Sequence, residues 1–401
     1  MPFRVGSLFA GVGGICLGFK NALLGNGQNG FELVWANEID DYAAATYRAN
    51  FRHHLIVGDI EKIVNLDRCD DEEERELYQT KMWETLDHQI DILAGGFPCQ
   101  AFSIAGERRG FDDHRGNLFW SIIELVNLLN QTHGRKPRVL FLENVKNLQN
   151  HDNGNTYRVI KGELIRLGYI VKEAVLNTMD FTQIPQNRER IFIVCFLNQE
   201  DADRFTMFDK DERGNYIHLD DYKLNFTEDD RRDQLDSIID YNLSFNDLQR
   251  YYYTRERYPH YFLTEEEYSQ IPEEERKEIR INLDEQITDM HQVYQIRRGM
   301  YVRRNMSGVC PTLTANMGTG GHNVPLIRVN DGIRKITPAE AFKLQGFPVG
   351  QGNIPIIEGG TNYILPENLS DGRLYKQAGN AVSVPVIKLI AEEILRALSD
   401  D

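Results

Sequence analysis

The chain has few cysteines and no long apolar run, and each absence excludes a class of protein. Its five cysteines are an odd number without tight spacing, which favours reduced thiols over a disulfide framework or a metal site. No apolar run reaches ~18 residues, the length that a membrane-spanning helix needs. The start Met1-Pro-Phe-Arg shows no signal peptide. We therefore expect a soluble, cytoplasmic protein without a metal.

The pattern along the chain predicts an α/β fold and a second domain. With 401 residues the chain is long enough for two domains, and a hydrophobic content of 41% excludes a mainly disordered protein. Helical patterns alternate with apolar strand segments at residues 3–9, 32–37, 55–58, 91–95, 138–143, 171–176 and 190–196. This alternation predicts a doubly wound, mostly parallel sheet. Residues 199–330 break the alternation, because they are rich in tyrosine and loops.

The most informative segment is residues 95–103, Gly-Gly-Phe-Pro-Cys-Gln-Ala-Phe-Ser. Cys99 follows Pro98 at the end of a predicted strand, and ligands of open α/β sheets bind outside the carboxyl ends of the strands. Pro98 fixes one backbone angle, and the paired glycines permit a tight turn. The segment predicts a thiol held rigidly at the rim of the sheet. An isolated cysteine is more often a buried core residue, but the neighbouring motifs argue against that interpretation.

Three strand ends near the N-terminus predict a cofactor site. Strand 3–9 runs into Gly11 and Gly13, which form either a tight turn or a loop that a cofactor approaches closely. The second strand ends in Glu38, which is placed to bind ribose hydroxyls, or is a solvated carboxylate. The third ends in Asp59, which can accept a hydrogen bond from an adenine amino group. The loop lacks the G-x-G-x-x-G pattern and pyrophosphate site of nicotinamide binding, so S-adenosylmethionine fits better.

Charged residues at two later strands predict a site for a base. Glu143 ends strand 138–143, where a half-closed pocket raises the pKa of a carboxyl so that it can share a proton with a ring nitrogen. The alternative is a carboxylate that caps the next helix. Arg188 and Arg190 alternate with Glu189, so both lie on one face. Two guanidinium groups there suit phosphate and a base carbonyl, or are ordinary surface charges.

Taken in order, these segments resemble the C5-cytosine-specific DNA methyltransferase family of the bacterial restriction–modification type. The matching segments span nearly the whole chain apart from residues 60–90 and about 200–290. They are Phe9-Ala-Gly-Val-Gly-Gly, Glu38, Gly58-Asp-Ile, Gly96-Phe-Pro-Cys-Gln-Ala-Phe-Ser, Arg115-Gly-Asn-Leu-Phe, Leu142-Glu-Asn-Val, Gln186-Asn-Arg-Glu-Arg, Pro311-Thr-Leu-Thr-Ala-Asn and Gln377-Ala-Gly-Asn-Ala-Val-Ser-Val-Pro.

The resemblance implies a class I S-adenosylmethionine-dependent fold and a covalent mechanism. In this family a thiolate, here Cys99, adds to C6 of a flipped-out cytosine while a carboxyl group, here Glu143, interacts at N3. Arg190 then holds the cytosine O2, Arg188 supports the nearby backbone, and the loop of residues 103–115 closes over the base. The implied cofactor-binding residues are Phe9, Gly11, Gly13, Glu38, Asp59, Ile60, Pro98, Leu118, Asn380 and Val382. The DNA-binding residues that we expect are Gln100, Ser103, Arg108, Arg297, Arg298, Arg303, Arg304, Thr312 and Thr314.

The resemblance also implies how the chain is divided and what it binds. We expect a catalytic domain of residues 1–198 plus 375–401, a target-recognition domain of residues 199–330 and a hinge of residues 331–374. Double-stranded DNA should lie in the cleft between the two domains. The expected cofactor is S-adenosyl-L-methionine, with S-adenosyl-L-homocysteine as its product. We expect a monomer, and a cognate restriction endonuclease acting on the same site is a further expected partner.

The net charge of −16 is unusual for a DNA-binding protein, but it is unevenly placed. Residues 200–290 hold 26 Asp and Glu against 12 Lys and Arg. They are predicted to be a solvated scaffold of short exposed helices, or less favourably a surface for a protein partner. Residues 291–330 hold five arginines and no acid. Within them, residues 294–304 and 311–321 are predicted to form two loops in the major groove, because both segments are basic or glycine-rich and carry no acid. Residues 294–304 also mix arginines with aromatic residues, as a nucleic-acid surface would.

Two other functions remain open. One branch of the family acts on tRNA and typically carries Cys-Phe-Thr after its last motif strand, where this chain has Cys195-Phe-Leu, with Cys195 predicted in the core. A catalytically silent nucleic-acid-binding module is the other. The complete set of Cys99, Glu143, Arg188 and Arg190 argues against it. The glycine-rich segment 309–323 resembles recognition loops of enzymes with short GC-rich sites, but the sequence does not decode the bases.

Overall fold

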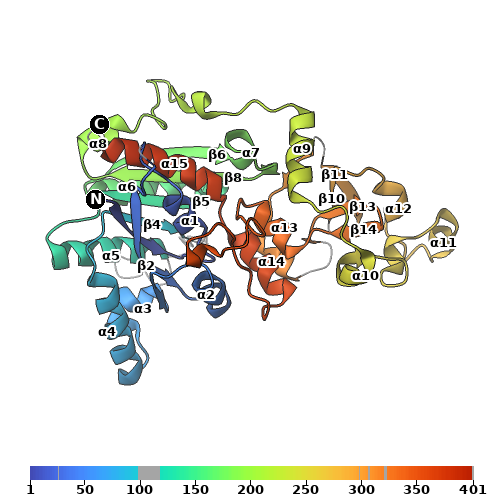
Figure 1. The fold of residues 1–401 in the computed structure, drawn as a ribbon, viewed down its shortest axis with the longest axis horizontal. Helices are drawn as coiled ribbons and strands as arrows, with labels where there is room; N and C mark the ends of the chain where they lie inside the picture. The colour runs from blue at the N-terminus through green and yellow to red at the C-terminus, as the bar shows by residue number, and fades with distance from the viewer. Residues whose placement is uncertain (26, 98–117, 298, 306–307, 320–322, 400–401) are drawn as a thin grey trace.

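The computed structural model describes the chain apart from residues 26, 98–117, 298, 306–307, 320–322 and 400–401. Two main sheets lie toward opposite ends of an elongated molecule (Figure 1). Between the sheets lie the helices α9 (Glu228–Ile238), α13 (Pro338–Lys343) and α14 (Asp371–Asn380) (Figure 1). Among the described residues, no helix combines the length and the hydropathy needed to span a membrane.

The larger sheet confirms the predicted doubly wound, mostly parallel architecture. Its seven strands follow the spatial order β3-β2-β1-β4-β5-β8-β6. The strands are β3 (His54–Val57), β2 (Phe31–Glu38), β1 (Phe3–Leu8), β4 (Ile92–Gly96), β5 (Val139–Val145), β8 (Glu189–Phe196) and β6 (Ile170–Asn177). All pairs from β3 to β5 are parallel, whereas β8 is antiparallel to both of its neighbours. The strand order reverses between β1 and β4, and open sheets of this kind bind ligands at such a point.

Helices pack on the larger sheet in two groups, each with a core of its own. The first group is α1 (Gly14–Lys20), α8 (Gln199–Arg204) and α15 (Val384–Leu398). The second is α3 (Ile60–Val64), α4 (Glu72–Leu86), α5 (Leu118–His133) and α6 (Asn155–Arg166). The C-terminal α15 packs directly on α1, where a Cβ atom at Gly18 would lie 2.5 Å from Ile387. Glycine at position 18 therefore permits the contact between the two ends of the chain.

The smaller sheet is antiparallel throughout and has the order β11-β10-β13-β14-β9. Its strands are β11 (Tyr301–Asn305), β10 (Val293–Arg297), β13 (Leu326–Val329), β14 (Gly332–Lys335) and β9 (Tyr252–Tyr253). The short helices α10 (Phe245–Leu248), α11 (Glu265–Gln270) and α12 (Leu283–Gln286) accompany it. The predicted loop over residues 294–304 is wrong, because β10 and β11 form a hairpin there. Tyr294 and Ile296, buried two residues apart, give the strand period that the arginine-rich composition concealed.

The acidic stretch of residues 200–290 contains an exposed helix, as predicted, and a second acidic helix lies between β3 and β4. In α11, the Thr264 hydroxyl accepts a hydrogen bond from the Glu267 N–H (3.2 Å), and the Glu267 carboxylate accepts one from the Thr264 N–H (2.9 Å). This reciprocal pair satisfies two backbone donors at the start of the helix. Between the third and fourth strands, α4 extends away from the larger sheet (Figure 1). Trp83 on this helix is 58% exposed.

A buried ion pair fixes the connection from the smaller sheet back to the larger one. Arg334 on β14 is 0% exposed and donates to Glu340 on α13, with 2.7 Å between Nη2 and Oε1. Arg334 also donates to the carbonyl of Asp240, whose N–H donates to Glu340. Thr337 caps α13 and Pro338 stands in its first turn, where the fixed backbone angle of proline suits a helix. The network joins the two chain segments that connect the sheets.

The limits of the predicted domains stay a prediction, and packing places two segments across them. Ala202, Phe205 and Met207 are buried in the core against α15 and the larger sheet, although the prediction begins the second domain at residue 199. Strand β14 belongs to the smaller sheet, although the prediction ends that domain at residue 330. The chain therefore leaves the larger sheet later than its change in composition indicates.

Candidate active site and target cavity

A glycine turn after β1 opens the candidate cofactor site. Phe9 has a φ of 52°, a left-handed conformation that costs a non-glycine residue roughly 1–2 kcal/mol. A hydrogen bond from the Ala10 N–H to the Asn37 carbonyl (2.9 Å) holds the turn against β2. Gly13 has a φ of 85°, and a Cβ atom there would lie 2.2 Å from the Phe51 ring. The turn therefore requires glycine at position 13 both for its backbone angle and for space.

Glu38 connects the end of β2 to this turn. Its Oε2 accepts a hydrogen bond from the Gly11 N–H (2.7 Å). Its Oε1 accepts from the N–H groups of Ile39 (2.9 Å) and Asp40 (2.8 Å). The residue is 8% exposed, so three backbone donors hold a nearly buried carboxylate at a fixed position.

Asp59 follows β3 by two residues and caps α3. Its Oδ1 accepts a hydrogen bond from the Glu61 N–H at 2.9 Å, and its own N–H donates to the Tyr78 hydroxyl at 3.1 Å. Asn37 ties β2 to this strand end by donating to the carbonyl of Gly58 (2.9 Å). The carboxyl ends of the first three strands are thus fixed to one another by polar side chains.

A cavity of about 660 Å³ lies at these strand ends. The predicted cofactor residues that line it are Phe9, Gly11, Glu38, Asp59, Ile60, Leu118, Asn380 and Val382. Gly13 supports the wall from behind without lining it, and Pro98 lies outside the described residues. The structure thus brings into one cavity residues that are far apart in the sequence.

The same cavity has a polar edge that the sequence interpretation missed. Lys376 on α14 pairs with Asp40, with 3.0 Å between Nζ and Oδ2, and both residues line the cavity beside Ile39 and Gln377. Partial burial opposes ionisation of Asp40, but the hydrogen bond from Lys376 and the α2 backbone outweigh it and lower its pKa. The sequence does contain one indication of this edge, because Lys376 directly precedes the Gln377-Ala-Gly-Asn segment that resembles the family.

Glu143 and Arg190 form an ion pair in this cavity. Glu143 stands opposite Gly96 in the β4–β5 pairing, and Nε of Arg190 lies 3.1 Å from its Oε1. Glu143 is 8% exposed, and burial raises the pKa of its carboxyl, although the charges of Arg190 and Arg188 partly offset the rise. As the alternation predicts, Arg188 and Arg190 line the same cavity. A carboxyl that holds a proton more readily than usual therefore faces the predicted cofactor wall.

Arg188 is an anchor for the backbone. It is 2% exposed and donates from Nη1 to the Leu313 carbonyl (2.8 Å) and from Nη2 to the Ala381 carbonyl (2.6 Å). Burial lowers the pKa of the guanidinium, yet an arginine keeps its charge at neutral pH. Its contacts join three segments that the sequence keeps far apart.

The predicted nucleophile and several predicted DNA contacts lie outside the described residues. These are Cys99, Gln100, Ser103, Arg108 and Arg298. The described chain stops beside the cavity at Phe97, whose carbonyl accepts a hydrogen bond from the Asn144 side chain (2.9 Å). Phe97 itself lines the cavity.

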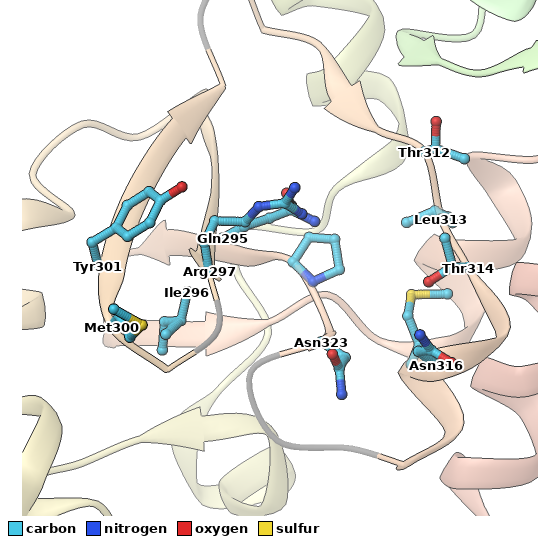
Figure 2. A pocket seen from close by; sticks show the side chains of 12 residues that line it. Gln295, Ile296, Arg297, Met300, Tyr301, Thr312, Leu313, Thr314, Asn316 and Asn323 are labelled. Carbon is cyan, nitrogen blue, oxygen red and sulfur yellow. Dashed lines mark hydrogen bonds between the residues drawn. The ribbon is translucent and has the colours of Figure 1, made fainter.

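A second cavity of about 600 Å³ lies between the β10–β11 hairpin and the segment that begins at residue 312. Figure 2 shows Gln295, Arg297 and Tyr301 on one side of the opening and Thr312 and Thr314 on the other. The remaining lining residues are Ile296, Met300, Leu313, Asn316, Met317, Asn323 and Pro325. The sequence interpretation missed the amides of Gln295, Asn316 and Asn323, although each lies within or beside a segment it singled out.

The hairpin separates the predicted DNA-binding arginines. In its register Gln295 stands opposite Arg303 and Arg297 opposite Tyr301, so Arg297 and Arg303 share one face. Arg304 stands opposite Tyr294 on the other face and pairs with Asp289, with 2.8 Å between Nη1 and Oδ2. Only Arg297 of the described arginines in this set lines the cavity.

The described cysteines are free, and none of them contributes to a metal cluster. Cys16, Cys69, Cys195 and Cys310 are unpaired, and Cys195 is 0% exposed, which confirms its predicted place in the core. Within the described part of the chain, no three His, Cys, Asp or Glu side chains lie together in a way that could hold a metal ion.

Comparison with known sequences gives matches along nearly the whole chain. A family model described as C-5 cytosine-specific DNA methylase matches residues 3–396. The Type II methyltransferase M.Bsp6I of Bacillus sp. strain RFL6 is 43% identical over 397 residues, which cover 98% of this chain and 99% of that protein. M.HpaII of Haemophilus parainfluenzae, also a Type II methyltransferase, is 32% identical and covers 98% of this chain and 89% of its own length.

Solved structures with the same fold are more distant in sequence. A mutant DNMT2 of Spodoptera frugiperda superposes with a TM-score of 0.57 at 17% identity, covering 98% of this chain and 99% of its own. The methyltransferase EhMeth of Entamoeba histolytica superposes with a TM-score of 0.55 at 16% identity, covering 100% of both chains. At such low identities the likeness establishes the fold alone.

Proposed function

The chain belongs to the C-5 cytosine-specific DNA methylase family, and on that premise we propose how it acts as a DNA (cytosine-5-)-methyltransferase of the Type II restriction–modification type. It transfers a methyl group from S-adenosylmethionine to C5 of a flipped-out cytosine in a specific short sequence of duplex DNA. The observation that carries this proposal is the single cavity that combines the Glu38 wall with the Glu143–Arg190 pair.

The cavity suits S-adenosylmethionine in size and in polar groups. A volume of about 660 Å³ falls within the range of small-molecule sites. The fixed Glu38 carboxylate would bind the ribose hydroxyls, Asp59 the adenine amino group and Asn380 the amino-acid end, with Phe9 packed on the adenine. When bound, the cofactor supplies an electrophilic methyl group on a sulfonium and leaves as S-adenosylhomocysteine.

In the proposed reaction, Cys99 is the nucleophile. Its thiolate adds to C6 of cytosine while the Glu143 carboxyl interacts at N3, and the electron pair that this addition places at C5 takes the methyl group. Loss of the C5 proton then expels the cysteine and leaves 5-methylcytosine. Covalent addition splits one difficult step into easier ones. In the sequence Cys99 stands two residues after Phe97, which lines the cavity.

Arg190 and Arg188 have different proposed roles. Arg190, which is held by Glu143, would donate to the cytosine O2 and so orient the base. Arg188 keeps the surrounding backbone in place through the carbonyls of Leu313 and Ala381. Because the target atoms are inaccessible in a duplex, the base must leave the stack, which costs a few kcal/mol.

Duplex DNA would lie between the two sheets and contact the second cavity. Residues 291–330, which hold five arginines and no acid, form much of that cavity and would meet the phosphates and base edges. The DNA methylase family match and the presence of Glu143, Arg188 and Arg190 in the first cavity weaken the tRNA and silent-module alternatives. A cognate endonuclease, a monomeric state and a cytoplasmic location stay proposals.

A methyl-transfer assay tests this function. The purified chain is given S-adenosylmethionine with a radioactive methyl group and either duplex DNA or tRNA, and DNA from expressing cells is sequenced after bisulfite treatment. We expect label in DNA only and 5-methylcytosine at one short sequence. Label in tRNA alone would support the first alternative, and no label in either nucleic acid would support the second.

A further inference from the structure

The backbone N–H and carbonyl of Leu313 are both held by side chains of the segment that leads to Arg190. Its N–H donates to Oε1 of Gln186 (3.2 Å), and its carbonyl accepts from Nη1 of Arg188 (2.8 Å). Gln186 is 0% exposed. The flanking residues Thr312 and Thr314 line the second cavity together with Leu313. Buried hydrogen bonds therefore join one wall of the second cavity, residues 312–314, to the segment that contains Gln186 and Arg188.

Further contacts extend this attachment along the segment. Strand β12 (Cys310–Pro311) pairs in parallel with β7 (Gln186–Asn187). The Cys310 N–H donates to the Pro185 carbonyl (2.7 Å), and the Thr312 hydroxyl donates to the Asn187 carbonyl (2.6 Å). The wall thus follows the backbone that leads directly into Arg188 and β8.

Gln186 and residues 312–314 also pack tightly against the segments around Leu344 and Gly379. Nε2 of Gln186 donates to the Leu344 carbonyl (2.6 Å), and Nε2 of Gln345 donates to the Ala378 carbonyl (2.8 Å). A Cβ atom at Gly379 would lie 2.1 Å from the carbonyl carbon of Thr314. Thr314 therefore lies directly against the backbone of Gly379, while Gln186 and Arg188 hold Leu313 on the other side.

We propose that Gln186 is a positioning residue that couples recognition of the target sequence to methyl transfer. The inference rests on the proposed function. When matching DNA seats against residues 312–314, Gln186 and Arg188 hold that wall in register with Arg190, which then meets the cytosine O2. A mismatched base pair displaces the wall, and the Arg190–Glu143 pair is misplaced even though the DNA stays bound. Such coupling runs through contiguous hydrogen bonds with defined partners.

The test compares substitutions of two neighbouring buried glutamines, Gln186 and Gln345. Gln186→Met removes the three side-chain hydrogen bonds of Gln186, which join it to Leu313, Leu344 and Gln345. Gln345→Met makes the same substitution at a residue that is also 0% exposed and whose side chain bonds to Ala378 and Gln186, outside residues 310–314. Single-turnover methylation and DNA affinity are measured on a duplex with the mapped site and on the same duplex with one non-target base pair changed.

For Gln186→Met we expect the ratio of rates on the two duplexes to fall about tenfold or more, while the Kd values for DNA and S-adenosylmethionine stay within about twofold, since coupling between sites typically lies in this range. Gln345→Met should keep the wild-type ratio. If Gln186 had only a structural role, thermal stability would change in both variants, but the ratio of methylation rates on the two duplexes would keep its wild-type value in both.

Two results would overturn the inference: a wild-type ratio in Gln186→Met, or an equal loss in Gln345→Met. If Gln186→Met does not fold, Gln186→Asn takes its place, because its shorter side chain cannot reach both Leu313 and Leu344; the same outcomes decide. Failure of the wild-type protein to methylate any DNA would instead contradict the proposed function.

Discussion

Nε of Arg190 lies 3.1 Å from Oε1 of Glu143, and both side chains face the cavity that Glu38 and Asp59 close from the other side. The ion pair stands where β4, β5 and β8 run side by side. Burial nevertheless raises the pKa of Glu143 above its ordinary value, so removal from water outweighs the nearby positive charges. The site therefore holds a carboxyl group at a cost to folding, which is typical of groups kept for chemistry.

The first prediction follows from that raised pKa. The unfolded carboxyl titrates near 4.5, and between this value and the raised folded pKa the folded protein binds more protons than the unfolded chain. The stability contributed by protonated Glu143 is thus present below pH 4.5 and lost as the pH rises through the folded pKa. Glu143→Gln should therefore gain stability relative to wild type between pH 5 and pH 8, where each tenfold difference in proton affinity between the folded and unfolded states is worth about 1.4 kcal/mol.

Urea unfolding of both proteins at the two pH values measures this difference. Glu189→Gln controls for the substitution itself, because Glu189 pairs with Lys146 instead of lining the cavity. A difference between Glu143→Gln and wild type that stays constant with pH would show that Glu143 does not hold its proton more readily in the folded protein.

The second prediction concerns Glu38. A lost hydrogen bond to a charged group costs about 1.5–3 kcal/mol, and Glu38→Ala also leaves the N–H groups of Gly11, Ile39 and Asp40 without their acceptor. The affinity for S-adenosylmethionine should fall roughly tenfold or more, since each 1.4 kcal/mol corresponds to a factor of ten. Calorimetry measures it, with Glu32→Ala at the exposed start of β2 as the control. Unchanged affinity would mean that Glu38 only holds the turn.

The third prediction distinguishes the arginines of the hairpin. Arg297→Ala should relax specificity at one position of the site, because an arginine that reads guanine is worth about 1–3 kcal/mol of discrimination. Arg303→Ala, on the same face but outside the cavity, should weaken binding evenly across sequences and reduce its salt dependence. Arg304→Ala should have the smallest effect, because Arg304 pairs with Asp289 on the other face.

Methylation of variant site libraries over a range of salt concentrations measures all three arginine variants. If all of them methylate the same site at wild-type rates, recognition lies elsewhere, with residues 200–290 as the next candidate, and the interpretation of that stretch as a scaffold is wrong.

The sequence alone predicted the larger sheet well because its strands are short apolar runs with polar residues at their carboxyl ends. Glu38, Asp59 and Glu143 each follow such a run, so their convergence at one edge follows from a parallel sheet. The antiparallel direction of β8 has no such local signal, because a strand's direction depends on how the chain returns to the sheet.

The target cavity was harder to predict because its walls are set by pairing between distant segments. The hairpin of β10 and β11 is marked only by the alternation of Tyr294 and Ile296, which the arginines obscure. The contacts of Gln186 with Leu313 and Leu344 join residues more than a hundred positions apart in the sequence. No pattern within these segments specifies the two contacts, so the sequence places Gln186 in a family motif but does not indicate its role.

The central claim is that the thiolate of Cys99 adds to C6 of the target cytosine. The most direct measurement uses duplex DNA with 5-fluorocytosine at the mapped site, since fluorine cannot leave C5 as a proton does and the adduct is trapped. After incubation with S-adenosylmethionine, proteolysis and mass spectrometry should find the DNA on the peptide that contains Cys99. The adduct should be absent from Cys99→Ala, which should still bind the cofactor, and present in Cys69→Ala. An adduct on another cysteine, or methylated DNA made by Cys99→Ala, would contradict the account.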